Sequence, residues 1–183
     1  VLVEEDDAYY LNAWRTRSGA YIIASLDSAV TSEVHYLDAG RPTDALKLVA
    51  PRRQGVEYSV DHHGERFLIL TNEEALNFKL METPVSALGR ENWKEVIPHS
   101  EEITLQSILA FKDHLVIYER ESGLTQLRVR RLADGAEHRI AVEARSYDLY
   151  PDSNAEFATT VLRYELISLS TPESVFDYDM DAR

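Results

Sequence analysis

Short apolar runs of about five residues recur along the chain, and polar segments rich in Gly, Pro, Asp and Asn separate them. Runs of this length between turn signals predict β-strands rather than helices. Four of the runs resemble one another, and steps of 46, 48 and 45 residues separate their centres, Ile23, Ile69, Ile117 and Leu162. A second set follows the first in steps of 44, 49 and 48 residues, with starts at Glu33, Asn77, Gln126 and Ser174. Two independent landmarks therefore indicate one internal repeat.

Further strand-like runs lie on either side of these landmarks. They cover 8–14, 56–61, 103–111 and 145–150 upstream, and 45–50, 93–97 and 137–142 downstream. Each unit of roughly 45 residues thus contains about four short strands, a pattern typical of β-propeller blades. One blade cannot bury both of its faces, so blades must stack to form a continuous core.

We therefore predict an all-β fold, a partial β-propeller of about four blades with four antiparallel strands each. The expected parts are an outer strand of a preceding blade at 1–5, blades at 8–50, 56–97 and 103–142, and an incomplete blade at 145–183. This is an open arc, and we interpret the chain as a fragment. Open blade ends expose apolar faces and free edges, so we expect the fragment to self-associate.

One connection has helical character. Thr71-Asn-Glu-Glu74 matches a capping box, the arrangement in which the first and fourth residues satisfy each other's backbone donors. We expect a short helical turn between Glu74 and Leu80, placed between two strands.

Charge and composition exclude several classes of partner. Nineteen basic and 32 acidic residues give a net charge of −13 with neutral histidines. We therefore expect no nucleic-acid partner and no docking on anionic membranes, since both require basic surface. The chain has no cysteine, which excludes disulfides and thiolate metal sites and fits a cytoplasmic protein. No apolar run is long enough for a transmembrane helix.

Motifs for catalysis are missing from this chain. The sequence contains no G-x-S-x-G elbow, no G-x-G-x-x-G loop and no P-loop. His62 and His63 are adjacent, so on a strand they point to opposite faces and cannot easily share a metal ion; we interpret them as part of a turn before Gly64. We therefore expect no catalytic residue, no cofactor and no metal site in this chain.

Arg52 and Arg53 form a small basic patch after Pro51 in an otherwise acidic chain. Guanidinium groups suit carboxylates, so this pair is a candidate contact across a domain interface. The alternative is a solvated turn without a partner.

Six segments together resemble the propeller of the oligopeptidase B branch of the prolyl oligopeptidase family of serine peptidases. They run in order through nearly the whole chain: Arg15-Thr-Arg-Ser-Gly-Ala-Tyr-Ile-Ile, Thr31-Ser-Glu-Val-His-Tyr-Leu-Asp, Ala50-Pro-Arg-Arg-Gln-Gly-Val-Glu-Tyr, His63-Gly-Glu-Arg-Phe-Leu-Ile-Leu-Thr-Asn, Asn77-Phe-Lys-Leu and Ser170-Thr-Pro-Glu-Ser-Val-Phe-Asp-Tyr-Asp. Each is an ordinary strand or turn, and their shared order is what makes the resemblance specific.

The resemblance implies a seven-bladed propeller that caps an α/β-hydrolase domain, in a serine peptidase that cleaves short peptides after Lys or Arg. The Ser, Asp and His of the triad would lie in the hydrolase domain, which we expect to be absent here, so this chain alone is predicted to be inactive. The implied partners are that catalytic domain and short basic peptides, and the propeller would gate the access of the peptides to the catalytic domain. The alternative is a free-standing propeller-like interaction scaffold.

Overall fold

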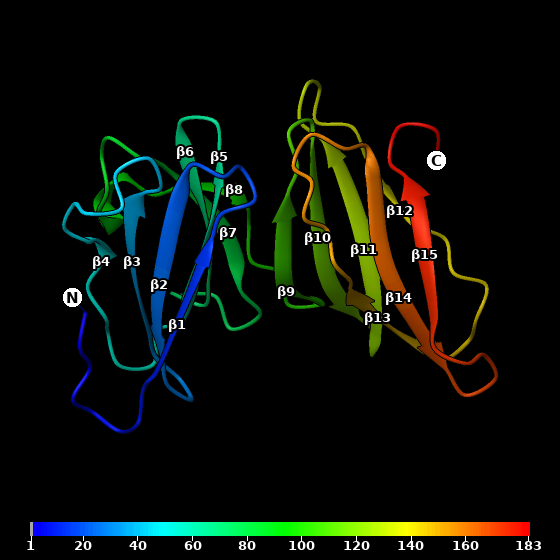
Figure 1. Cartoon of the computed structure of the whole chain (residues 1–183). Coiled ribbons are helices and arrows are strands. Elements are labelled where there is room, and N and C mark those ends of the chain that lie inside the picture. Colours follow the sequence, from blue (N-terminus) through cyan, green and yellow to red (C-terminus); the bar gives the residue numbers. More distant parts are fainter. Residues whose placement is uncertain (1) are drawn as a thin grey trace. The chain divides into compact units, whose positions relative to one another are not determined.

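Fifteen β-strands and one three-residue 3₁₀ helix make up the regular structure of residues 2–183, the part of the chain that the computed structural model describes. The strands form four antiparallel sheets in which neighbours along the chain are neighbours in the sheet (Figure 1). The chain divides into two compact units, Val1–Ser100 and Glu101–Arg183, which are described separately. The all-β prediction is confirmed.

The first unit contains two four-stranded sheets. The first sheet has the order β1 (Tyr10–Arg15), β2 (Tyr21–Asp27), β3 (Ser32–Asp38) and β4 (Lys47–Ala50). The second has the order β5 (Tyr58–His63), β6 (Arg66–Thr71), β7 (Lys79–Pro84) and β8 (Lys94–Ile97), with the 3₁₀ helix Arg90–Asn92 before its last strand.

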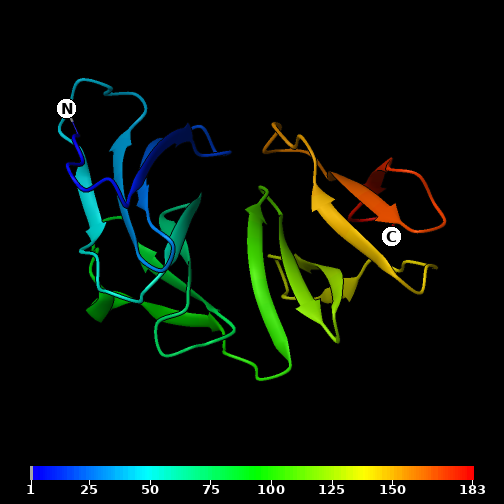
Figure 2. The ribbon, with the colours of Figure 1, turned by 90° about the horizontal axis from the view of Figure 1, so that it is seen from below.

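The second unit contains a four-stranded and a three-stranded sheet. The four-stranded sheet consists of β9 (Ile103–Ala110), β10 (His114–Glu121), β11 (Leu124–Arg131) and β12 (Glu137–Arg139). The three-stranded sheet consists of β13 (Tyr147–Pro151), β14 (Val161–Ser168) and β15 (Ser174–Asp179). Figure 2 shows the same sheets from below.

Burial along the strands explains the sequence pattern. The strands β3 and β11 alternate between buried and more accessible residues, as expected for a strand with one face in a core. The second strands of the first three sheets, β2, β6 and β10, are instead buried over four to six consecutive residues. Both of their faces are covered, so they appear in the sequence as continuous apolar runs.

Tight turns join the first two strands of these sheets. Gly64 lies between β5 and β6 with φ 63°, and Gly19 lies between β1 and β2 with φ 72°. Ser122 and Gly123 connect β10 to β11 with φ angles of 51° and 82°. Two consecutive positive φ values are typical of a type I′ hairpin turn, whose twist matches that of the strands it joins.

Each unit has its own hydrophobic core between its two sheets. In the first unit, Tyr36 of β3 and Phe67 of β6 lie edge to face, with ring centroids 5.0 Å apart. The rest of that core comes from both sheets: Ile23, Val34, Val49, Ala50, Tyr58, Val60 and Ile69. In the second unit the buried residues are Phe111, Val116, Tyr118, Leu127, Val129, Ile140, Leu149, Leu162, Tyr164, Leu166 and Met180. Packing of one sheet on the next is what a blade requires.

Two expected elements differ from the structure. The outer strand expected at 1–5 begins at Val1, outside the described residues, and residues 2–5 form no strand. The expected helical turn after Glu74 is replaced by non-helical turns that lead into β7. Glu74 and Phe78 have φ angles of 53° and 63°, which a right-handed helix cannot contain. The Thr71 hydroxyl accepts the N–H of Glu73 and donates to the carbonyl of Glu57, so it joins strand ends instead of capping a helix.

Candidate functional site

Arg52 fastens the N-terminal segment onto the first sheet. Its guanidinium pairs with the carboxylates of Glu4 and Glu33, and its carbon Cζ lies 4.1 Å from the centre of the Tyr9 ring. Its backbone N–H also donates to Glu33, at 3.0 Å. The hydrogen bond to Glu4 is the main reason that the pKa of Arg52 is raised. Arg52 therefore has partners within its own unit.

Arg53 and Arg90 share one carboxylate. The Arg53 Nη1 lies 2.6 Å from Glu73 Oε1, and the Arg90 Nε lies 2.9 Å from Glu73 Oε2. Arg90 also donates to the carbonyl of Pro51, at 2.7 Å. The Arg53 side chain is 59% exposed, whereas that of Arg90 is only 10% exposed. Arg53 is thus the member of the predicted pair whose guanidinium remains open to a further contact.

Tyr58 joins the two sheets of the first unit through its hydroxyl. The hydroxyl accepts the N–H of Val34 at 2.9 Å and donates to the carbonyl of Ala50 at 2.5 Å. Val34 and Ala50 flank a β-bulge between β3 and β4, and a bulge leaves backbone groups unpaired. Burial raises the pKa of Tyr58 to about 12.

His62 forms a second connection between these sheets. Its Nδ1 lies 2.7 Å from the Ser18 hydroxyl, which lies 3.0 Å from the Thr16 hydroxyl, and Thr16 can donate to the carbonyl of Tyr21. A proton on Nδ1 lets each group in this chain donate to the next. The His62 Nε2 is buried without a hydrogen-bond partner among the described residues. The neutral ring fits this site, because burial disfavours the charged imidazolium.

Acidification should destabilise the first unit through His62. Burial lowers the pKa of His62 in the folded protein, so below about pH 6.5 the unfolded chain binds a proton that the folded chain does not. The contribution of the neutral His62 ring to the free energy of unfolding is therefore complete above this pH and is lost progressively as the pH falls below it. We expect His62→Gln to reduce the change in urea midpoint between pH 7.5 and pH 5.5. His99→Gln, at an exposed position, is the control; an equal reduction in both variants would contradict the assignment.

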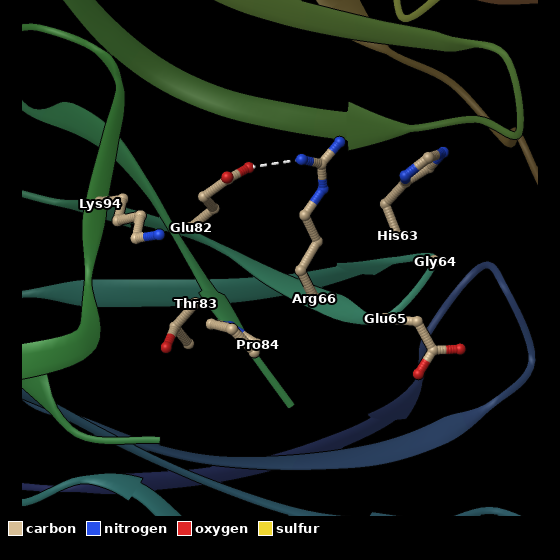
Figure 3. A pocket seen from close by; sticks show the side chains of 8 residues that line it. All are labelled: His63, Gly64, Glu65, Arg66, Glu82, Thr83, Pro84 and Lys94. Carbon is tan, nitrogen blue, oxygen red and sulfur yellow. Dashed lines mark hydrogen bonds and ion pairs between the residues drawn. The ribbon is translucent and has the colours of Figure 1, made fainter. Parts of the chain in front are cut away.

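A hollow of about 450 Å³ lies over one end of the second sheet. Its lining comes from the β5–β6 turn, β6, the end of β7 and the start of β8: His63, Gly64, Glu65, Arg66, Glu82, Thr83, Pro84 and Lys94 (Figure 3). Cross-strand register explains why five of these side chains share a face, whereas Glu65 and Thr83 are one residue out of phase and point to the other face. Glu82 is opposite Lys94, and Arg66 is opposite both His63 and Pro84.

The charges in this pocket are only partly paired. Arg66 Nη1 lies 2.7 Å from Glu82 Oε2. Lys94 and the Glu65 carboxylate form neither an ion pair nor a side-chain hydrogen bond with any residue in 2–183. In Figure 3 Lys94 lies on the Glu82 side of the Arg66–Glu82 pair, and the Glu65 side chain points away from that pair.

In the second unit, Glu119 of β10 is completely buried and forms ion pairs with two arginines. Its Oε2 accepts from the Nε of Arg128 at 3.0 Å, and its Oε1 accepts from the Nε and Nη2 of Arg139 at 3.0 and 2.7 Å. Glu137 pairs with Arg128 from the other side. Such a network holds three strands together and has no free group to act on a substrate.

Within residues 2–183, no three His, Asp or Glu side chains are grouped so that they could hold a metal ion. None of the helices in that range is long and apolar enough to cross a membrane.

His62 and His63 point to opposite faces of β5, His62 into the core and His63 to the pocket. The pocket was not predicted from the sequence, because its lining residues come from four strands and one turn that only the strand register brings together.

Consecutive four-stranded antiparallel meanders that pack face to face define a β-propeller domain. The whole chain, residues 1–183, matches the family model described as the prolyl oligopeptidase N-terminal β-propeller domain. The chain therefore belongs to this family.

Two similar curated proteins are bacterial peptidases. Protease 2 of Moraxella lacunata is 35% identical over 180 residues, which are 98% of this chain and 26% of that protein. Dipeptidyl aminopeptidase BI of Pseudoxanthomonas mexicana is 33% identical over 178 residues, which are 97% of this chain and 24% of that protein. The chain thus spans about a quarter of the length of the curated relatives it matches.

Solved structures show the same fold. Oligopeptidase B from Trypanosoma brucei, in a closed form with covalently bound antipain, superposes with a TM-score of 0.90 at 26% identity. That match covers 98% of this chain and 27% of the other. Oligopeptidase B from Leishmania major gives a TM-score of 0.87 at 28% identity over 97% of this chain and 26% of the other.

Proposed function

We propose that this chain is a propeller segment of a serine peptidase of the oligopeptidase B type, which cleaves short peptides after Lys or Arg. The observation that carries this proposal is the family match over the whole chain, together with the likeness to Protease 2 and to two oligopeptidases B. The propeller itself would be non-catalytic, and the triad would lie in a separate hydrolase domain. Blades at 8–50, 56–97, 103–142 and 145–183 remain our proposed divisions, and we propose a cytoplasmic location.

The propeller would act as a gate in front of the catalytic domain. A narrow entrance admits short flexible peptides and excludes folded proteins, and closure removes water from the reacting groups. We also propose that the propeller attracts substrates electrostatically, and the net charge of −13 supports this role. Negative potential concentrates cationic substrates near the site, and salt screens this effect.

Arg53 is our candidate for contact with the catalytic domain. Its exposed guanidinium is held in place by Glu73 through one nitrogen, which leaves further donors for a carboxylate or carbonyl. Arg52 would instead hold the loop after β4 in place through its ion pairs with Glu4 and Glu33.

Kinetics of the full-length protein test the proposal. We expect kcat/KM for a short fluorogenic peptide ending in Arg to exceed that for its Ala counterpart at least about a hundredfold, as a charged specificity pocket would give. Salt should lower kcat/KM for the Arg peptide more than for the Ala peptide. A folded protein with the same cleavage site should resist cleavage until it is unfolded. Equal cleavage of the Arg and Ala peptides, or equal cleavage of folded and unfolded protein, would contradict the assignment.

Arg53→Ala in the full-length protein should weaken the preference for short peptides over the folded protein, measured in the same assay. Arg41→Ala is the control.

A further inference from the structure

The two most exposed large apolar side chains within residues 2–183 occupy the same place in two different sheets. Leu76 is 88% exposed and lies between β6 and β7, and Leu169 is 98% exposed and lies between β14 and β15. Each thus follows the second strand of its sheet. Val30, which is 48% exposed, lies in the corresponding loop of the first sheet. Single exposed apolar residues are common on protein surfaces, but their recurrence in one loop of the repeat indicates a shared role.

The backbone around Leu76 is held in a strained conformation. Glu74 and Phe78 have φ angles of 53° and 63°, and left-handed backbone at residues other than glycine costs energy and is concentrated at functional positions. Ala75 is buried, and its N–H donates to the carbonyl of Asn72 at 3.0 Å. The loop therefore presents Leu76 to solvent in a fixed position, which lowers the entropy cost of a contact with a partner.

Three loops of the first unit form one continuous surface around Leu76. The N–H of Gly55 donates to the Thr31 hydroxyl at 3.1 Å, and the carbonyl of Gly55 accepts from the Asn72 side chain at 3.3 Å. The loop after β4 is therefore bonded to the loop on either side of it. We call this surface the loop edge, and it consists of residues 28–31, 51–57 and 72–78.

The loop edge combines apolar and cationic groups. Val30 and Leu76 are its exposed aliphatic side chains. Arg53, whose side chain is 59% exposed, uses one nitrogen on Glu73 and keeps further donors for another acceptor. Apolar contacts bordered by polar ones are typical of protein interfaces. A partner that fits the loop edge therefore offers an apolar hollow with a carboxylate beside it.

Strand direction determines which part of a longer protein meets the loop edge. The strands of each sheet alternate in direction, so the turn after the second strand and the end of the fourth strand lie at one end of the sheet. A polypeptide that passes from a blade to another domain leaves the blade at this end. The chain spans about a quarter of the length of its curated relatives, and the proposed function assigns a hydrolase domain to the remainder.

We propose that the loop edge docks the hydrolase domain, with Leu76 in an apolar hollow of that domain and Arg53 on a carboxylate beside it. This assignment rests on the proposed function and adds an apolar anchor to the gate. Leu76 would be covered while the propeller is closed against the hydrolase domain and exposed to water when the gate opens.

Photo-crosslinking of the full-length protein tests where Leu76 lies. The photoreactive residue p-benzoylphenylalanine replaces Leu76 in one variant and Arg41 in the matched control, since Arg41 is exposed in the β3–β4 loop at the opposite end of the first sheet. Diisopropyl fluorophosphate labels a reactive serine and so marks the hydrolase domain. We expect position 76 to form intramolecular cross-links, mapped by mass spectrometry, to the domain that carries the labelled serine. Position 41 should form none to that domain.

Kinetics of full-length variants give a second readout. Leu76→Ser should reduce the preference for a short Arg peptide over a folded protein at least about tenfold, because an apolar hollow no longer favours the closed gate by the burial of a leucine. Leu76→Met should retain the preference, since methionine fills a similar apolar volume. Both variants should keep the wild-type unfolding midpoint of the propeller, because Leu76 is exposed in its own unit.

The outcomes separate this proposal from the proposed function. The docking assignment alone is overturned if the protein cleaves the Arg peptide but position 76 forms no cross-links, or forms them only within residues 1–183 or between two molecules. An unchanged size preference in Leu76→Ser also overturns it. If the protein neither cleaves the Arg peptide nor carries a labelled serine, the proposed function fails, and the identity of the docking partner fails with it.

Discussion

Glu119→Gln should lower the free energy of unfolding of the second unit by about 3 kcal/mol, the scale found when one partner of a buried ion pair is removed. Glu119 is completely buried, and its two oxygens face the guanidinium groups of Arg128 and Arg139. A glutamine of the same size retains one acceptor and presents an NH₂ group to a cation. Both arginines then lose their shared carboxylate while they remain partly buried.

Urea denaturation with circular dichroism measures this loss. Glu137→Gln is the matched control, since Glu137 also pairs with Arg128 but is 29% exposed at its side chain. Exposed pairs contribute only about 0.2–1 kcal/mol, so the control should shift the midpoint much less. Equal shifts in the two variants would show that the Glu119 network is hydrated and that burial does not determine its strength.

Tyr58→Phe should destabilise the first unit by about 2 kcal/mol, because it removes one oxygen and leaves two buried backbone groups without partners. These groups are the N–H of Val34 and the carbonyl of Ala50. The ring, its packing in the core and the strand pairing are unchanged by the substitution. The loss therefore measures the hydroxyl as a link between the sheets.

Tyr36→Phe is the control for this measurement. Tyr36 is buried in the same core, but its hydroxyl forms no hydrogen bond within residues 2–183. We expect its denaturation midpoint to remain near that of the wild type. Hydrogen exchange gives a second readout, since the Val34 amide should lose protection in Tyr58→Phe and retain it in Tyr36→Phe. Retained protection in Tyr58→Phe would mean that another group replaces the hydroxyl.

The fold class and the family could be predicted from the sequence because both depend on local and repeated patterns. Runs such as the one centred on Ile69 are apolar throughout because both faces of β6 are covered, and Gly64 marks the turn before it. The side-chain links could not be predicted in the same way. Glu119 pairs with Arg139, 20 residues away, and Tyr58 reaches Val34, 24 residues away. Such pairs depend on strand register and on sheet stacking, which a single sequence does not specify.

The expected helical turn shows a different limit. Thr71 and Glu74 match the capping pattern, but a capping box requires right-handed backbone after it. The left-handed conformations at Glu74 and Phe78 redirect the chain into β7. Arg52 and Arg53 were identified as a basic patch, but the sequence did not reveal that Glu4, Glu33 and Glu73 serve as their carboxylate partners.

The bulges in the last strand pairs of the first two sheets bear on how the repeats should be aligned. Val34 pairs with Ala50 and His35 with Leu48, so Val49 is the extra residue; by the same reasoning Val96 is the extra residue opposite Leu80 and Met81. These two valines are 47 positions apart, so the irregularity itself repeats. A bulge changes the phase of the in–out alternation by one residue. Because both sheets carry the extra residue at the same place, their last strands align without a gap, whereas the third sheet needs a gap there, since β11 pairs with β12 without a shift.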